Sequence, residues 1–155
     1  MALNKLEIRW IKRKVGHNQT PTDSIDFLID GKSLFELLNA EDRDLVGVFS
    51  PRWVDNEATA KIFKAERLSS LKDHRVLVFG CGECCDIGCG GITMSVNRER
   101  APNRIVWRDF AFGNDIDESV TDKTSYISIG PFEFEDEDYR RVVDFANESR
   151  TSSAK

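Results

Sequence analysis

The stretch RVLVFGCGECCDIGCGGITMSVNRERAPNRIVWRDFAF, residues 75–112, decides the fold. It holds a nearly continuous apolar run at 75–79, an alternating run at 92–97 and a third apolar run at 105–112. A glycine-rich turn and a turn containing proline separate the three runs. Short strand-like runs joined by turns of this kind predict an antiparallel meander.

Strand patterns continue on both sides of this meander. Alternation of apolar and polar residues predicts strands at 6–13 and 25–29, with a polar loop at 16–23 between them. After the meander, Ile127 and Ile129 predict a last short strand.

Helix signals occur at three places. Ser33 and Glu36 have the spacing of a capping box and predict a short helix at 34–40. Apolar residues at helical spacing predict a second helix from about 55 to 68 and a third at 136–148, with a frayed tail at about 149–155. We therefore expect a single α+β domain over residues 1–155, in which an antiparallel sheet carries helices on one face, including a C-terminal helix.

The overall composition is that of a globular protein. The chain has 155 residues, of which 40% are hydrophobic and 10% aromatic, and this aromatic content argues against disorder. No apolar run approaches the roughly 20 residues of a membrane helix. The first fifteen residues, MALNKLEIRWIKRKV, lack the apolar core of a signal peptide. We therefore expect a cytoplasmic protein that does not act at a membrane.

All four cysteines lie in one glycine-rich turn, at Cys81, Cys84, Cys85 and Cys89. The spacing of Cys81 and Cys84 suits a zinc knuckle, although no second ligand pair follows at the usual distance. The same pair can form a redox-active disulfide. A third interpretation is that the cysteines are small apolar residues that pack in a tight turn. The sequence leaves open a zinc site, a thiol module and a packing role.

Charge is segregated along the chain. The net charge is −5, but ten acids and only one base, Lys123, lie between Asp109 and Asp138. That span carries −9, so the rest of the chain carries +4. One interpretation is that both regions are simply solvated. The other is a surface that attracts a basic protein and repels nucleic acid.

No catalytic motif accompanies this charge pattern. The chain has no nucleophile elbow, zinc-protease helix or P-loop, and its two histidines, His17 and His74, have no evident nucleophile beside them. We therefore expect a non-enzymatic binding protein, of the kind that neutralises a basic nuclease toxin as its immunity protein. The expected contact residues are acidic, with two aromatic neighbours: Asp109, Asp115, Asp117, Glu118, Asp122, Glu135, Asp136, Trp107 and Phe112.

The second half of the chain also resembles a family of small, mostly uncharacterised bacterial proteins. The resemblance covers about residues 75–146 and is carried by C-x-D-x-G-C at 84–89, V-W-x-D-F at 106–110, and G-P-F-x-F at 130–134 followed by Tyr139. The family turn is similar to C-x-C-G-D-x-G-C, whereas this chain has Gly82 where that pattern has its first cysteine and Cys85 where it has a glycine. Some proteins of this kind are labelled oxidoreductases and others resemble toxin-immunity proteins, which implies a binding role as one expectation.

Overall fold

The computed structural model describes residues 3–16, 18–51, 56–82, 89–100, 103–114 and 121–153. Its strands are β1 (Leu6–Val15), β2 (Thr20–Ile29), β3 (Lys32–Ser33), β4 (Leu45–Gly47), β5 (Val76–Cys81), β6 (Gly91–Arg100), β7 (Asn103–Gly113) and β8 (Phe132–Glu135). Its helices are α1 (Leu34–Leu37), α2 (Asn56–Phe63) and α3 (Asp136–Ser153), and short 3-10 turns include η1 (Ala40–Asp42), η2 (Lys72–His74) and η5 (Thr124–Tyr126).

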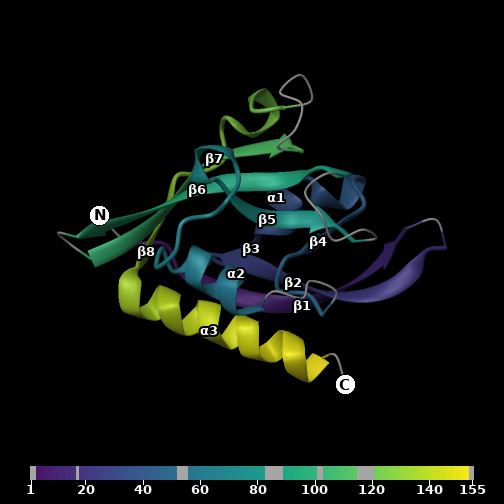
Figure 1. The fold of residues 1–155 in the computed structure, drawn as a ribbon, viewed down its shortest axis with the longest axis horizontal. Coiled ribbons are helices and arrows are strands. Elements are labelled where there is room, and N and C mark those ends of the chain that lie inside the picture. Colours follow the sequence, from purple (N-terminus) through teal and green to yellow (C-terminus); the bar gives the residue numbers. More distant parts are fainter. Residues whose placement is uncertain are drawn as a thin grey trace.

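The strands form two antiparallel sheets rather than the single sheet predicted. A three-stranded sheet has the order β1-β2-β3, and a five-stranded sheet has the order β4-β5-β6-β7-β8 (Figure 1). The α+β class, the meander through β5, β6 and β7, and the C-terminal helix are confirmed. Helix α3 packs against α2, β1 and the strands β7 and β8, and it continues beyond its predicted end at residue 148.

The two sheets meet where β4 crosses β2. The Gly47 N–H donates to the Ser24 hydroxyl at 2.8 Å. A Cβ atom at Gly47 would lie 2.1 Å from the carbonyl oxygen of Ile25, so only glycine permits this approach. This contact between residues far apart in sequence could not be read from local alternation.

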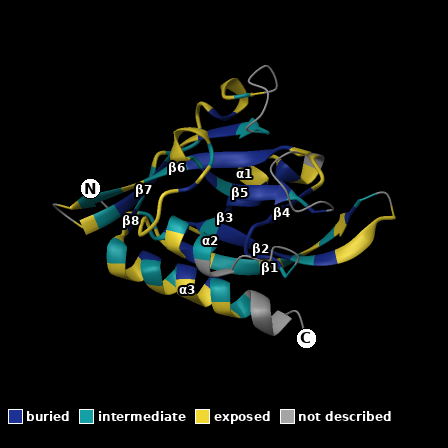
Figure 2. Cartoon of the chain, in the orientation of Figure 1, coloured by how far each residue is buried: buried dark blue, intermediate teal, exposed yellow. Residues whose placement is uncertain are grey.

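Two local predictions are wrong. Residues 20–23 belong to β2 rather than to a loop, because β1 and β2 continue to pair as a long hairpin, with Lys14 opposite Pro21. Residues 127–129 form no strand, and Ile127 is 85% exposed. The last strand is instead β8, which pairs with the first half of β7. Figure 2 shows the inner strands largely buried and the end of the β1–β2 hairpin exposed.

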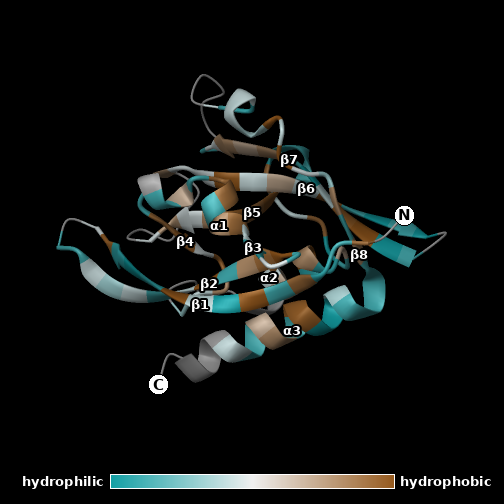
Figure 3. Cartoon of the chain, turned by 180° about the vertical axis from the view of Figure 1, so that it is seen from behind, coloured by the Kyte–Doolittle hydropathy of each residue, from teal (hydrophilic) through white to brown (hydrophobic). Residues whose placement is uncertain are grey.

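Trp107 occupies the centre of the hydrophobic core. Its ring lies 5.3 Å from Phe27 on β2, 4.9 Å from Phe134 on β8 and 5.8 Å from Tyr139 on α3, measured between ring centroids. These edge-to-face distances are those that aromatic pairs prefer. Outside the core, Figure 3 shows hydrophilic residues towards the turn end of the β1–β2 hairpin.

Two buried polar networks join elements around this core. The Trp107 Nε1–H donates to the Tyr139 hydroxyl at 3.0 Å, and that hydroxyl donates to the Phe63 carbonyl at the end of α2 at 2.5 Å. The Asp26 carboxylate, which is fully buried, accepts three hydrogen bonds that link β1, β2 and the start of α1: from Arg9 Nε, the Ser33 hydroxyl and the Phe35 N–H. A buried carboxylate requires such partners.

None of the helices in the described part of the chain combines the length and the apolar character needed to cross a bilayer.

The Tyr139 network predicts a stability effect. Tyr139→Phe removes the hydroxyl and leaves the Trp107 N–H and the Phe63 carbonyl buried without this partner, which should lower the free energy of unfolding by about 1–3 kcal/mol. Urea denaturation measures this change. Tyr126→Phe is the matched control, because the Tyr126 side chain is buried but its hydroxyl makes no hydrogen bond with a described residue. Equal losses in the two variants would contradict the assigned role of the network.

Candidate functional site

A β-bulge interrupts β7 at Asp109. Thr93 of β6 faces Ala111, but Ser95 faces Arg108, so two residues of β7 lie opposite one residue of β6. Asp109 has a φ of +57°, in the left-handed region. Bulges break the alternation of a strand and occur often beside functional sites. Here the consequence is that Arg108 and Asp109, consecutive in sequence, line the same hollow.

This hollow, which we call the bulge hollow, has a volume of about 500 Å³. It lies between the residue that precedes β5, the bulge of β7 and the segment that runs from η5 to β8. Its lining combines charged residues with an apolar side: Arg75, Arg108, Asp109, Phe110, Lys123, Thr124, Tyr126, Ile127, Ile129, Gly130 and Pro131.

Arg75 is held in place by uncharged acceptors. Its Nε–H donates to the Thr93 hydroxyl at 2.8 Å, and its Nη2 donates to the carbonyls of Thr93, at 3.0 Å, and of Asp109. Burial lowers the pKa of the Arg75 guanidinium, while the carboxylates of Asp109 and Asp73 act to raise it. The result is a fixed, partly desolvated cation at the edge of the hollow.

The other two cations of the bulge hollow are less constrained. Arg108 Nη2 lies 3.6 Å from a carboxylate oxygen of Glu99, and Arg108 Nε is buried with no hydrogen-bond partner among the described residues. Lys123 is exposed and forms no ion pair within the described part of the chain.

Two residues that flank positions 115–120 in the sequence pair with each other beside the bulge hollow. Phe112 and Asp122 form an isolated β-bridge with two backbone hydrogen bonds of 2.9 Å each. The Asp122 carboxylate accepts hydrogen bonds from the N–H and hydroxyl of Ser125, and these bonds lower its pKa. The half-buried Phe112 ring packs under the Arg43 guanidinium, 3.8 Å from the ring centroid. Asp115, Asp117 and Glu118 lie outside the described residues.

The predicted acidic surface is divided between two ends of the sheet. Glu135 pairs with Arg104 at the start of β7, whereas Asp122 bridges Phe112 near its end. At about 3.3 Å per residue these positions are roughly 25 Å apart. The two groups therefore cannot form one continuous patch.

Glu135 and Asp136 also have structural partners of their own. The Glu135 carboxylate accepts a hydrogen bond from the Asp138 N–H at the start of α3, at 2.7 Å. Asp136 lies 3.2 Å from Arg140 and 3.7 Å from Arg98. Burial, Glu135 and Glu66 raise the pKa of Asp136. These two acids stabilise the start of the helix, as acids in a first turn do.

Trp107 is not a contact residue, contrary to the prediction. It is fully buried at the centre of the core, and so it cannot touch a partner without unfolding. Trp107 stands in a continuous apolar run, and such a run does not show which of its side chains are buried and which are exposed. Asp109 is exposed, as a contact residue must be.

Sequence reasoning missed most of the lining of the bulge hollow, including the cations Arg75, Arg108 and Lys123 and the exposed Ile127. One signal was available for Arg108. It stands beside Asp109 within an otherwise apolar run, and two consecutive charged residues cannot both avoid the core face of a regular strand. Such a pair indicates a bulge.

The cysteine turn is only partly described. Cys81 ends β5 and carries a thiol, whereas Cys89 is disulfide-bonded. Cys84 and Cys85 lie outside the described residues. A sulfur in a disulfide is no thiolate ligand, so a site with all four cysteines bound to zinc is incompatible with this state. Among the described residues, no group of three or more His, Cys, Asp or Glu side chains is arranged to hold a metal ion.

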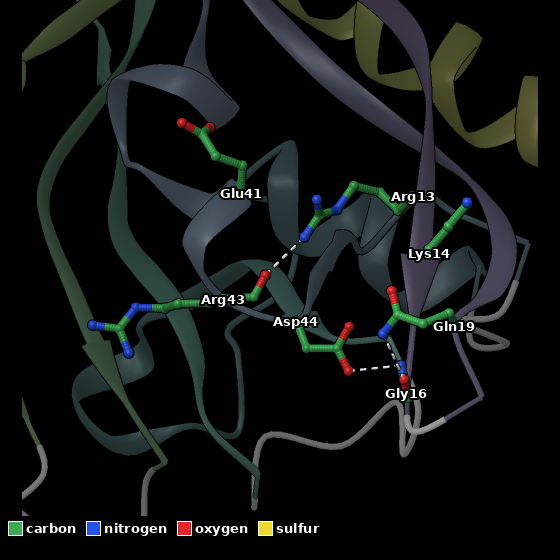
Figure 4. Close-up of a pocket in the computed structure, with 7 residues that line it drawn as sticks. All are labelled: Arg13, Lys14, Gly16, Gln19, Glu41, Arg43 and Asp44. Carbon is green, nitrogen blue, oxygen red and sulfur yellow. Dashed lines mark hydrogen bonds between the residues drawn. The ribbon is translucent and has the colours of Figure 1, made fainter.

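A second hollow, of about 630 Å³, lies at the turn end of the β1–β2 hairpin, and we call it the hairpin hollow (Figure 4). Its polar groups bind one another and the backbone. Arg13 donates to the carbonyls of Leu45, at 3.1 Å, and Arg43, at 2.7 Å, and the Asp44 carboxylate accepts from the Gly16 N–H at 2.8 Å. These contacts attach the hairpin to the segment before β4 and explain the hollow as a structural feature.

The hydrogen bonds of Asp122 predict a pH effect. Because its folded-state pKa is lowered, Asp122 stabilises the fold above the ordinary pKa, and this contribution is lost as the pH falls through the lowered value. Ser125→Ala removes one of the two bonds and should raise the pKa of Asp122 towards 3.8. Carboxyl-carbon NMR titration measures it. Ser128→Ala, at an exposed serine nearby, should leave the pKa of Asp122 unchanged. If that pKa rises equally in the Ser128→Ala variant, the hydrogen bond from Ser125 is not what lowers it.

The disulfide of Cys89 predicts how many cysteines react. Alkylation of the unfolded, non-reduced protein should leave Cys89 and its partner unmodified, whereas Cys81 should react. Reduction before alkylation should make all four cysteines reactive. Peptide mass spectrometry distinguishes the two states, and full modification of Cys89 without reductant would show that this bond is absent from the purified protein.

Comparison with protein-family models, with curated proteins and with solved structures finds no match. The resemblance to small bacterial proteins therefore stays a prediction. Two of its three motifs, at 106–110 and 130–134, are nonetheless neighbours in space. The ring centroids of Phe110 and Phe132 lie 6.0 Å apart, and Gly130 packs against Phe110 and the Trp107 carbonyl. Both motifs contribute to the bulge hollow.

Proposed function

We propose that the chain is a non-enzymatic binding protein of the toxin-immunity kind, which covers a basic toxin domain with the surface around the bulge hollow. The observation that carries this proposal is the exposure of Ile127. Its side chain is 85% exposed, the most exposed of the large hydrophobic residues described, and it lies at the rim of a hollow with charged walls. We call this part of the lining, Asp109, Lys123, Ile127, Ile129 and Pro131, the docking surface.

The docking surface has the composition of a protein interface. Interfaces commonly have an apolar centre within a polar or charged rim, and a few central side chains account for most of the binding energy. Ile127, Ile129 and Pro131 supply apolar contact, and Asp109 and Lys123 supply charge beside it. Isolated exposed apolar residues are ordinary, but one set at the rim of a hollow is suited to a partner.

The acids beside the hollow, rather than the three cations that line it, favour a basic partner. The segment 115–120 carries −3 in its sequence, and Asp109 and Asp122 lie on either side of it along the chain. Acidic groups of this kind steer a basic protein to the surface and raise its association rate. Trp107, Glu135 and Asp136 are not part of the docking surface.

A thiol-based role is the second candidate. It is favoured by the two oxidation states of the cysteines: Cys89 is in a disulfide, whereas Cys81, at the end of β5, carries a thiol. The same disulfide speaks against the zinc form of that alternative.

Ile127→Lys tests the docking surface. Co-expressed with the product of the adjacent gene, the wild-type chain should protect cells from its toxicity and co-purify with it, and the variant should do neither. Placing a cation in an apolar interface centre costs well over tenfold in affinity. Phe145→Lys is the matched control: Phe145 is 59% exposed on α3, which lies on the opposite side of the molecule from η5 (Figures 1 and 3). If both variants lose binding of the toxin equally, or if both retain it, the docking surface is wrong.

Charge reversal tests the nature of the partner. Asp117→Lys with Glu118→Lys should slow association with a basic partner while changing its dissociation much less, and added salt should reduce the difference. Stopped-flow or surface-based kinetics measure both rates. Association that is as fast as that of the wild type at low salt would exclude an acidic docking segment.

A further inference from the structure

We infer that the bulge hollow is a binding site for a carboxylate joined to an apolar group. This inference does not require the proposed function, because it rests on the hollow itself. The hollow presents three cations and one carboxylate among its lining residues, together with an apolar side.

The cations of the bulge hollow are incompletely compensated. Arg75 is held by a hydroxyl and two carbonyls, and it forms no ion pair with any described residue. Arg108 has one distant carboxylate, that of Glu99, and a buried Nε without a partner. Buried donors of this kind are normally satisfied. Lys123 adds a third positive charge with no ion pair in the described part of the chain.

The nearby carboxylates do not cancel this charge. Asp109 lines the hollow, and Asp73 acts on Arg75 from outside the lining. Glu99 is 3.6 Å from one terminal nitrogen of Arg108 and is absent from the lining. Among the residues that line the hollow, an anionic group would meet three cations and one carboxylate. A guanidinium binds a carboxylate through parallel hydrogen bonds, which suits Arg108 to this role.

The apolar side of the hollow selects the rest of the ligand. Ile127, Ile129 and Pro131 lie on the segment that leads to β8, and the buried Phe110 forms part of the same lining. A volume of about 500 Å³ is within the range of small-ligand sites, roughly 300–1,000 Å³. A branched aliphatic group next to a carboxylate fits both halves of this surface.

Two sources supply this chemistry, a small free carboxylic acid and the carboxylate at the end of a peptide with an apolar last residue. The peptide carries a longer chain on its carboxylate than the small acid does, and titration with one ligand of each kind distinguishes the two sources. N-acetyl-leucine represents the small acid. A six-residue peptide that ends in leucine with a free carboxylate represents the peptide end, and the tighter ligand identifies the source.

The experiment is a titration of the ¹⁵N-labelled full chain with N-acetyl-leucine, followed by NMR. The expected result is a saturable shift of the Arg108 Nε–H signal and of the amides of residues 123–130, with little response to the neutral N-acetyl-leucinamide. Arg108→Gln and Lys123→Gln should each weaken binding by roughly tenfold, the loss expected for one charge-assisted contact.

Lys14→Gln is the matched control, since Lys14 is an exposed lysine that lines the hairpin hollow, shown in Figure 4. This variant should bind N-acetyl-leucine as tightly as the wild type does. If Arg108→Gln fails to fold, Lys123→Gln still tests the inference, because Lys123 is exposed and its replacement should not affect folding. Equal binding of the acid and the amide, or unchanged affinity in Lys123→Gln, would overturn the inference.

Discussion

The hydrogen bonds from the Trp107 indole to the Tyr139 hydroxyl, and from that hydroxyl to the Phe63 carbonyl, join three elements that are distant in sequence. They attach β7 to α3 and to the end of α2. Because both bonds are buried, the geometry of all three groups is fixed together. β7 is also the strand that carries the bulge, so the position of the bulge hollow depends on the same anchor.

Local periodicity was sufficient to predict β5, β6, β7 and α3. Alternation and helical spacing are properties of neighbouring residues, and packing did not override them here. The division into two sheets was beyond such reasoning, because it depends on the close approach of Gly47 to Ile25 across the chain. The extension of β2 through Pro21 was missed for a related reason, since pairing with β1 outweighs the turn-like composition.

The candidate site was less predictable than the fold. A run of acids in sequence becomes a patch only if the chain keeps those acids together, and the pairing of β8 with the start of β7 carries Glu135 away from Asp122. The cations of the bulge hollow come from three separate segments, at Arg75, Arg108 and Lys123, and no sequence spacing relates them. Only the adjacent charges at 108–109 pointed to an irregular strand.

The bridge between Phe112 and Asp122 has a consequence for how the protein can change over evolution. At this bridge Phe112 pairs with Asp122, and β7 also pairs with β6 as far as Gly113. The segment that it closes can therefore alter in length and sequence without a change of strand register. A lineage could exchange the charge of that segment while the sheet, the helix and the core stay the same.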